Sequence, residues 1–274
     1  MSVETRPAPE AATYDATQWE ALAGDWGQRR PQTLWRTYCD LAHSSLIERW
    51  LPEQGVERVL KTDLFDEVLT DGLYPVLARK ARHVMGMDVA ASAAAQATTR
   101  HPRLATLSAD ARRLPFADGS FDAIVSNSTL DHFATLDEIA VSLRELARIT
   151  RPGGTLVLTL DNLANPVVAL RSVLPLGLLR RLGLVPYYVG ATCGPRRLRA
   201  LVAEAGFTVT HVEQIMHCPR VLAVALARVV ERHASAETQR RLLLHLAWYE
   251  RLERWPTRDW TSYFTAIRAV RAAG

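Results

Sequence analysis

The stretch FDAIVSNSTLDHFATLDEIAVSLRELARITRPGGTLVLTL, residues 121–160, decides the fold. Its two ends, residues 121–126 and 155–160, are short apolar runs that are typical of buried strands. Between them Thr135 and Glu138 have the spacing of a capping box, and apolar residues then recur at helical spacing until Pro152 ends the pattern. The stretch therefore predicts a strand, a crossover helix and a second strand parallel to the first.

The same alternation extends toward the N-terminus. Strands are expected at residues 56–64, 83–89 and 104–107, and helices at residues 65–81 and 90–99. Strands that alternate with helices indicate an α/β fold with a mainly parallel sheet, because right-handed crossovers cover both faces of the sheet. The fold class thus follows from the pattern alone.

Four parts are expected along the chain. Residues 1–51 form an N-terminal tail and a helical cap, and residues 52–162 form a Rossmann-like core. Residues 163–194 are apolar but interrupted by arginines and prolines, so they predict a lid or substrate-covering insertion, with an interfacial helix as the alternative. Residues 195–274 complete the core and carry a helical insertion.

In this last part, periodicity predicts two helical segments and two strands. The helical segments are residues 195–206 and 221–252, and the strands are residues 207–214 and 260–270. The second of these strands is expected to close the sheet.

The composition narrows the class of protein. With 48% hydrophobic and 23% charged residues among 274, the chain has enough apolar side chains for a full core. Its net charge of +4 comes from scattered arginines without a basic stripe, which argues against nucleic acid as a partner. Three cysteines without framework spacing indicate reduced thiols and a cytoplasmic location. No apolar leader or uncharged run of spanning length is visible, so neither export nor membrane insertion is expected.

Ligands of open parallel sheets lie beyond the carboxyl ends of the strands. Asp88 ends the second predicted strand, where a carboxylate can accept both hydroxyl hydrogens of a ribose; it can also simply cap the helix that follows. Asp110 follows the third predicted strand, where it can accept from an adenine amino group or stabilise a turn. Both positions favour a nucleoside site at this edge.

Five ordered segments resemble the class I S-adenosylmethionine (SAM)-dependent methyltransferases of small molecules. They are Gly86-Met87-Asp88, Asp110-Ala111-Arg112-Arg113-Leu114-Pro115-Phe116, Asp118-Gly119-Ser120-Phe121-Asp122-Ala123-Ile124-Val125-Ser126, Leu130-Asp131-His132-Phe133 and Arg148-Ile149-Thr150-Arg151-Pro152-Gly153-Gly154-Thr155-Leu156. The resemblance covers about residues 59–162. It implies a SAM pocket, S-adenosylhomocysteine (SAH) as product, and a seven-stranded sheet whose last strand is antiparallel.

The first loop departs from that family's acidic, glycine-rich pattern. Its residues are Lys61-Thr62-Asp63-Leu64-Phe65-Asp66-Glu67, and the side chains of Leu64 and Phe65 would obstruct close approach of a cofactor. Lys61 replaces the acid expected near the cofactor's ammonium, and Asp63, Asp66 and Glu67 are candidates to compensate. Lys61 could hold a carboxylate, act as a base, exclude SAM, or only pair with Asp63 or Glu67.

These considerations give three sets of candidate residues. His132, which could deprotonate an acceptor hydroxyl or be a packed loop histidine, and Lys61 are the catalytic candidates. The cofactor-binding candidates are Lys61, Thr62, Asp63, Asp66, Glu67, Asp88, Val89, Asp110, Ala111, Ser126 and Asn127. The substrate-binding candidates, which could equally be packing residues, are Tyr14, Trp35, Tyr38, His43, His132, Tyr187 and Tyr188. No set of three or four metal ligands is visible, so no metal is expected.

Three functions remain in competition. The leading hypothesis is a SAM-dependent methyltransferase that acts on a small metabolite. The main alternative is an enzyme of the same fold that catalyses cyclisation, elimination or isomerisation, with proton transfer by Lys61 or His132. The third is a catalytically silent binding protein.

Overall fold

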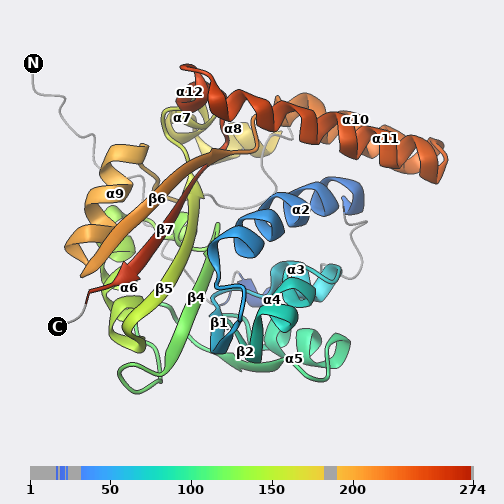
Figure 1. Ribbon diagram of the computed structural model, residues 1–274. Helices are drawn as coiled ribbons and strands as arrows, with labels where there is room; N and C mark the ends of the chain where they lie inside the picture. The colour runs from blue at the N-terminus through green and yellow to red at the C-terminus, as the bar shows by residue number, and fades with distance from the viewer. Residues whose placement is uncertain (1–16, 18, 22, 24–31, 182–189, 273–274) are drawn as a thin grey trace, which may run out of the picture.

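The computed structural model describes Thr17, residues 19–21, Ala23 and residues 32–181 and 190–272 (Figure 1). Seven strands form one sheet in the order β3-β2-β1-β4-β5-β7-β6. They are β1 (Val56–Lys61), β2 (Ala81–Asp88), β3 (Ala105–Ser108), β4 (Phe121–Asn127), β5 (Thr150–Asp161), β6 (Phe207–Ile215) and β7 (Phe264–Arg271). Only β7 runs antiparallel to its neighbours β5 and β6. The expected fold class is confirmed, including the antiparallel last strand.

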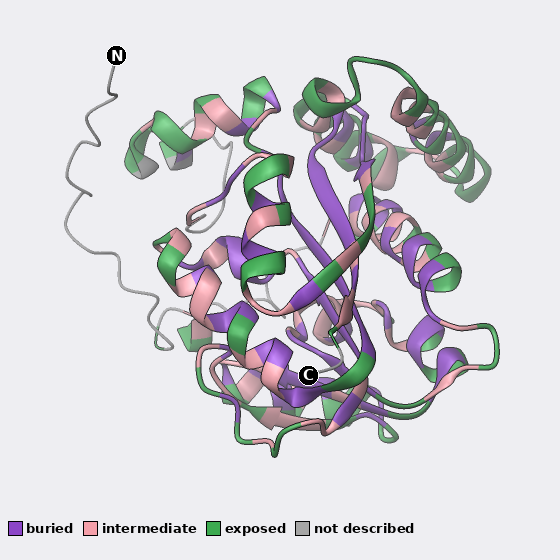
Figure 2. Ribbon diagram, turned by 60° about the vertical axis from the view of Figure 1, so that its left-hand side comes forward, coloured by how far each residue is buried: buried purple, intermediate pink, exposed green. Residues whose placement is uncertain are grey.

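Helices cover both faces of the sheet (Figure 2). On one face α2 (Thr33–Trp50), α4 (Tyr74–Lys80) and α5 (Ala91–Arg100) pack through side chains such as Trp35, Leu77 and Ala97. On the other face α6 (Leu136–Ile149) and α9 (Pro195–Glu204) pack through side chains such as Leu143 and Leu198. The buried strands therefore lie between two apolar layers.

The helix expected at residues 65–81 is in fact two helices, α3 (Phe65–Leu69) and α4. The chain turns between them at Gly72, whose φ of 53° lies in the left-handed region that favours glycine. The buried carboxylate of Glu67 accepts a hydrogen bond from the backbone N–H of Leu73 at 2.9 Å, so a side chain replaces the helical acceptor. The prediction of one continuous helix was wrong for this reason.

The capping box predicted before the crossover helix is present. The Thr135 hydroxyl accepts from the backbone N–H of Glu138 at 3.2 Å, and the Glu138 carboxylate accepts from the backbone N–H of Thr135 at 3.1 Å. Ile139, Leu143 and Leu146 are then fully buried. These contacts fix where α6 begins and which face it buries.

The remaining helices follow the carboxyl ends of β5 and β6, and α10 and α11 run from there along α2 (Figure 1). They are α7 (Pro166–Val173) and α8 (Leu176–Arg181) after β5, α10 (Arg220–His233), α11 (Ala236–Trp248) and η2 (Tyr249–Arg254) after β6, and α12 (Arg258–Thr261) before β7. The strand expected from residue 260 begins only at Phe264, because α12 occupies the preceding residues. Within the described ranges, none of the helices combines the length and apolar character needed to cross a bilayer.

Candidate functional site

The carboxyl ends of β1, β2 and β4 lie side by side. Lys61 at the end of β1 pairs in register with Gly86 of β2 on one side and with Val125 of β4 on the other. Three of the sequence segments proposed to bind a nucleoside therefore meet at one rim of the sheet.

Asp88 is half-buried at the end of β2. Its Oδ2 accepts from the backbone N–H of Leu64 at 3.0 Å, and its Oδ1 accepts from the backbone N–H of Ala90 at 2.8 Å. Burial raises the pKa of Asp88 to about 6, although both backbone N–H groups oppose this shift. The Ala90 contact is the helix-capping role considered from the sequence, and the Leu64 contact was not visible there.

Leu64 fills the space that the first loop leaves above β2. Its side chain is fully buried, and a Cβ added at Gly86 would overlap Cδ2 of Leu64. Gly86 is thus required for packing against the loop. The loop lies on the sheet through an apolar side chain where the resembling family has glycines.

Lys61 points into the protein and pairs with the buried carboxylate of Glu67. Its Nζ lies 2.8 Å from Oε2 of Glu67 and donates to the backbone carbonyl oxygen of Asp63 at 2.6 Å. The Lys61 and Glu67 side chains are 1% and 0% exposed. Burial alone would lower the pKa of Lys61, but Asp63, Glu67 and Asp66 outweigh it and raise that pKa. The ammonium is therefore held charged by an internal ion pair.

Asp66 and Asp63 occupy different surroundings in the same loop. Asp66 forms an ion pair with Arg36 of α2 at 2.8 Å. Asp63 Oδ2 accepts from the Thr129 hydroxyl at 3.1 Å, and the side chain of Asp63 is 20% exposed. Of the three loop acids, Asp63 is the one whose carboxylate is tied to the loop after β4.

A chain of hydroxyl groups joins β1 to β4 at this point. The Thr62 hydroxyl donates to Oγ of Ser126 at 2.9 Å and lies 2.9 Å from Oγ1 of Thr129. Thr62 and Ser126 are buried, so their hydroxyl groups face each other inside the protein. Thr129 was missed from the sequence, because nothing in its spacing indicates that its hydroxyl turns back toward β1.

Asp110 lies after β3, and its carboxylate binds Arg112. The Arg112 Nη2 donates to Oδ2 of Asp110 at 2.6 Å, while Nη1 donates to Glu138 of α6 at 2.5 Å. Ala111 between them is buried. Arg112, also missed from the sequence, thus anchors the segment proposed for adenine to the start of the crossover helix.

The loop after β4 forms η1 (Leu130–His132), which carries two titratable side chains. The His132 ring lies 4.7 Å from the Trp19 ring in an edge-on arrangement. Asp131 is buried, and its Oδ2 accepts from the Ser128 hydroxyl at 2.8 Å. Burial, aided by the charge of Asp161, raises the pKa of Asp131 to about 6.

Asp161 at the end of β5 completes this group. Its Oδ2 is 2.5 Å from Nη2 of Arg171 on α7. Oδ1 of Asp131 and Oδ1 of Asp161 are both buried without a hydrogen-bond partner in the described part of the chain. Neither Asp131 nor Asp161 was a candidate from the sequence, because their shared burial depends on how the loop after β4 packs beside the end of β5.

The proposed substrate-binding residues fall into three places. Trp35 and Tyr38 are packed between α2 and the helices after β6, with the Tyr38 hydroxyl donating to Glu250 at 2.6 Å. His43 lines a void between α2 and the sheet that is too narrow to hold a water molecule. His132 lies at the rim as described, whereas Tyr14, Tyr187 and Tyr188 lie outside the described residues.

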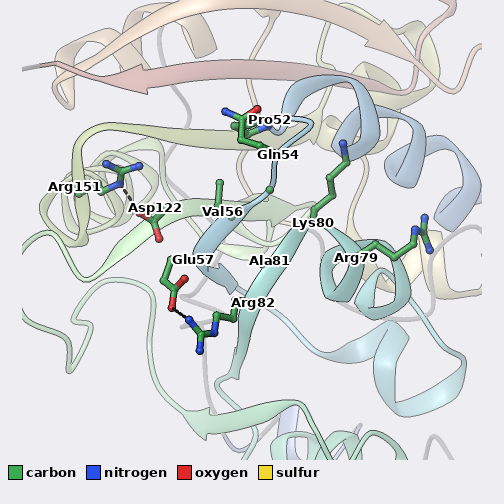
Figure 3. A pocket seen from close by; sticks show the side chains of 11 residues that line it. Pro52, Gln54, Val56, Glu57, Arg79, Lys80, Ala81, Arg82, Asp122 and Arg151 are labelled. Carbon is green, nitrogen blue, oxygen red and sulfur yellow. Dashed lines mark ion pairs between the residues drawn. The ribbon is translucent and has the colours of Figure 1, made fainter.

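A larger hollow of about 590 Å³ lies at the opposite rim (Figure 3). Its walls include the first residues of β1 and β2, and Arg151 and Asp122 pair across one side at 2.5 Å. It is far from the carboxyl ends where parallel sheets bind ligands, so its size alone does not make it the candidate site. In the described ranges no group of three His, Cys, Asp or Glu side chains could hold a metal ion.

Comparison with known proteins identifies part of the core. Residues 68–158, a third of the chain, match the family model described as a methyltransferase domain. A demethylmenaquinone methyltransferase of Beutenbergia cavernae is 42% identical over 74 residues, which are 27% of this chain and 30% of that protein. The chain thus matches less than a third of the length of this curated relative.

Solved structures extend the likeness to most of the chain. The [4+2]-cyclase SpnF superposes with a TM-score of 0.56 at 18% identity, covering 85% of this chain and 80% of that one. A Haemonchus contortus phosphoethanolamine N-methyltransferase 2 in complex with SAM superposes with a TM-score of 0.57 at 15% identity, covering 96% and 58%. At such identities the likeness shows the fold. The sequence of residues 68–158 thus identifies a methyltransferase domain, and the sheet around it has the fold of the class I SAM-dependent methyltransferases.

Proposed function

We propose that this protein transfers a methyl group from SAM to a small-molecule acceptor in the cytoplasm. The observation that carries the proposal is Asp88, a half-buried carboxylate at the carboxyl end of β2 that two backbone N–H groups hold in place. A carboxylate so oriented keeps lone pairs for the two hydroxyl groups of a ribose. This position is the one that binds adenosine in the resembling family.

The remaining contacts to the nucleoside come from neighbouring strand ends. Val89 and the Asp110-Ala111 turn would flank the base, with Asp110 held by Arg112. Ser126 and Asn127 would form the floor between the nucleoside and the acceptor. The adenosine half of SAM therefore fits the residues that are present.

The methionine half meets a loop of different chemistry. The Lys61 charge is compensated within the loop, by Glu67 at 2.8 Å and by Asp63 at 3.5 Å, so it does not repel an incoming ammonium as an exposed lysine would. Asp63, with Thr62 and Thr129 behind it, is the acid we propose to receive that ammonium, while Asp66 and Glu67 hold the loop. The internal pair thereby allows a glycine-free loop to accept a charged cofactor.

Bound SAM supplies an electrophilic methyl group, and the protein's task is to place the acceptor in line with it. His132 lies in the loop after β4, where an imidazole can take a proton from an acceptor hydroxyl. Asp131 and Asp161 offer buried acceptor atoms on the same side. Residues 163–194 and the cap of residues 1–51 would enclose the acceptor, while residues 52–162 hold the nucleoside.

Calorimetric titration with SAM and SAH, followed by transfer of labelled methyl groups to a panel of small-molecule acceptors, tests this function. We expect micromolar or tighter binding of both nucleosides and label on at least one acceptor. Absence of nucleoside binding by the full chain would overturn the proposal.

A second function is favoured by one observation, the fully buried Leu64 in place of a loop glycine. If Leu64 prevents productive placement of the methyl donor, the fold would instead catalyse a cyclisation, elimination or isomerisation, with His132 moving the proton. Binding of SAH without methyl transfer to any acceptor would favour this alternative.

A further inference from the structure

Exposed apolar side chains gather on the helices at the carboxyl rim of the sheet. On α7, Val167, Leu170 and Val173 are 50%, 58% and 77% exposed. Their spacing of three residues places them on one side of the helix, away from the buried Val168. α7 therefore buries one face and presents an apolar stripe on another.

α10 repeats this arrangement. Leu222, Leu226 and Val229, spaced by four and three residues, are 69%, 48% and 58% exposed. Ala223 and Ala227 are buried on the side of α10 that packs in the core with α2. An ordinary surface helix would carry polar residues where α10 carries leucine and valine.

Residues 251–260, which run from η2 into α12, are rich in arginine and tryptophan. Trp255 and Trp260 are 60% and 66% exposed, and Arg251, Arg254 and Arg258 in the same segment are exposed as well. Large exposed indole rings beside guanidinium groups are typical of surfaces that lie at the boundary between lipid and water.

These elements share one rim. α7 follows β5, α10 follows the parallel strand β6, and α12 directly precedes the antiparallel β7, so all three lie at the same end of the sheet (Figure 1). Asn162, before α7, donates to the backbone carbonyl oxygen of Asp259 in α12 at 2.7 Å. The stripe of α7 and the tryptophans thus belong to neighbouring parts of the surface.

The charge of these segments is strongly positive. Residues 163–181 contain three arginines and no acidic residue, and residues 220–260 contain eight arginines and five acidic residues. Together they carry a net charge of +6, although the whole chain carries only +4, so the rest of the chain is net acidic. The exposed apolar side chains and the excess positive charge are therefore located on the same segments.

We propose that the exposed side chains of residues 163–181 and 220–260, the rim surface, dock on an anionic membrane with the helices in the plane of the lipid headgroups. Apolar stripes would enter the headgroup boundary, while arginines would contact lipid phosphates. A second copy of this chain is a poorer occupant, because a symmetric interface would bring two arginine-rich surfaces together. Docking goes beyond the proposed methyl transfer and does not depend on it.

Vesicle flotation tests this surface. The full chain is mixed with large vesicles of phosphatidylcholine, or of phosphatidylcholine containing about 30% phosphatidylglycerol, near 0.1 M salt. We expect at least about fivefold more protein bound to the anionic vesicles, and release as the salt concentration rises. Equal binding to both, or binding to neither, would overturn the proposal.

Paired variants distinguish vesicle binding through the rim surface from nonspecific adhesion of the protein. Leu222→Ser/Leu226→Ser and Arg254→Gln/Arg258→Gln should each lower binding at least about fivefold. Val212→Ser, at an apolar side chain 37% exposed on β6, and Arg82→Gln, at an exposed arginine of β2, should leave it unchanged. Unchanged melting temperatures would show that the rim variants still fold.

Two further measurements distinguish membrane docking from dimerisation and from the proposed methyl transfer. If light scattering finds a dimer that Leu222→Ser/Leu226→Ser dissociates, the occupant is a second copy and the membrane proposal fails. SAH titration of the same samples reports on the proposed function independently. If the protein binds anionic vesicles but not SAH, the membrane proposal stands and the proposed methyl transfer fails.

Discussion

The backbone N–H of Leu64 donates to Oδ2 of Asp88 at 3.0 Å, which ties the first loop to the end of β2. In this arrangement the loop without glycine supports the Asp88 carboxylate. The apolar Leu64 side chain packs over Gly86 while its backbone orients Asp88. The position of Asp88 and the packing of the loop are therefore coupled through one residue.

Asp88→Asn should weaken SAH binding by roughly 10- to 100-fold, since a neutral amide loses charge-assisted hydrogen bonds worth about 1.5–3 kcal/mol. The side chain keeps its size and one acceptor oxygen, so the fold should persist. Isothermal titration calorimetry with SAH measures the change.

Asp122→Asn is the matched control for Asp88→Asn. Asp122 also accepts from a backbone N–H, that of Arg58 at 2.7 Å, but at the amino end of β4. We expect SAH affinity to be unchanged in this variant. Equal losses in both variants would indicate a general loss of structure and would remove Asp88 from the site.

SAH affinity should depend on pH through Asp88. Its pKa is raised to about 6, and the ionised form is the one that accepts ribose hydroxyls. The affinity should therefore be constant above about pH 7 and fall toward tenfold per pH unit below the pKa. Titrations between pH 5 and 8 measure this profile, and Asp88→Asn should flatten it. A wild-type profile without this fall would show that protonation of Asp88 does not control binding.

Lys61→Met should destabilise the protein by about 3–5 kcal/mol, because it leaves the fully buried Glu67 carboxylate without its partner. The double variant Lys61→Met/Glu67→Leu should recover much of that loss, since it removes both charges. Urea unfolding of Lys61→Met, Glu67→Leu and the double variant gives the coupling free energy. Wild-type stability in Lys61→Met would mean that the pair has no structural role.

Stability should rise as the pH falls from about 8.5 to 6.5. Burial raises the pKa of Asp40 to about 8 and that of Glu67 to about 7, so the folded state binds protons in this window that the unfolded state does not. Each such group adds at most about 1.4 kcal/mol per pH unit. Burial also lowers the pKa of His43, which works in the opposite direction below about pH 6.5.

Melting temperatures measured between pH 8.5 and 6.5 test the direction in which stability changes with pH. Asp40→Asn removes one of the titrating groups and should reduce the slope, because Asp40 then no longer gains a proton beside Asp66 and Glu67. A melting temperature that falls as the pH is lowered from 8.5 to 6.5 would contradict the raised pKa values of Asp40 and Glu67.

The sequence predicted those features that depend on local spacing. The alternation of strands and helices, the capping box of Thr135 and Glu138, and the place of Asp88 at a strand end are all local patterns, and the structure has each of them. The break between α3 and α4 was not predicted, because it depends on where the Glu67 side chain goes once Lys61 is buried.

Dependence on side-chain direction and tertiary packing also explains which features of the site were not predicted from the sequence. Whether Lys61 faces a ligand or the interior depends on side-chain direction, which periodicity does not specify in a loop. The pairing of Asp161 with Arg171 joins β5 to α7, ten residues apart, at no regular spacing. Such contacts are set by tertiary packing and become visible only in the folded structure.

The backbone at Gly190 is hydrogen-bonded to the loop that carries His132. The backbone N–H of Gly190 donates to the carbonyl oxygen of Asp131 at 2.7 Å, and that of Ala191 donates to the carbonyl oxygen of Phe133 at 2.7 Å. A Cβ at Gly190 would overlap the Phe133 carbonyl oxygen, so alanine there must displace either the loop after β4 or the backbone of Gly190 itself.

Gly190→Ala should therefore cost about 1–3 kcal/mol of stability through overpacking and lower kcat at least about tenfold through misplacement of His132. SAH affinity should change little, since Asp88 lies on β2 and is held by Leu64 and Ala90. Gly177→Ala in α8, where an added Cβ meets no atom within 4 Å, should leave the SAH affinity unchanged and gain up to about 1 kcal/mol of stability. If Gly190→Ala instead loses SAH binding and keeps kcat, the loop after β4 serves the nucleoside rather than the acceptor, and His132 is not the base.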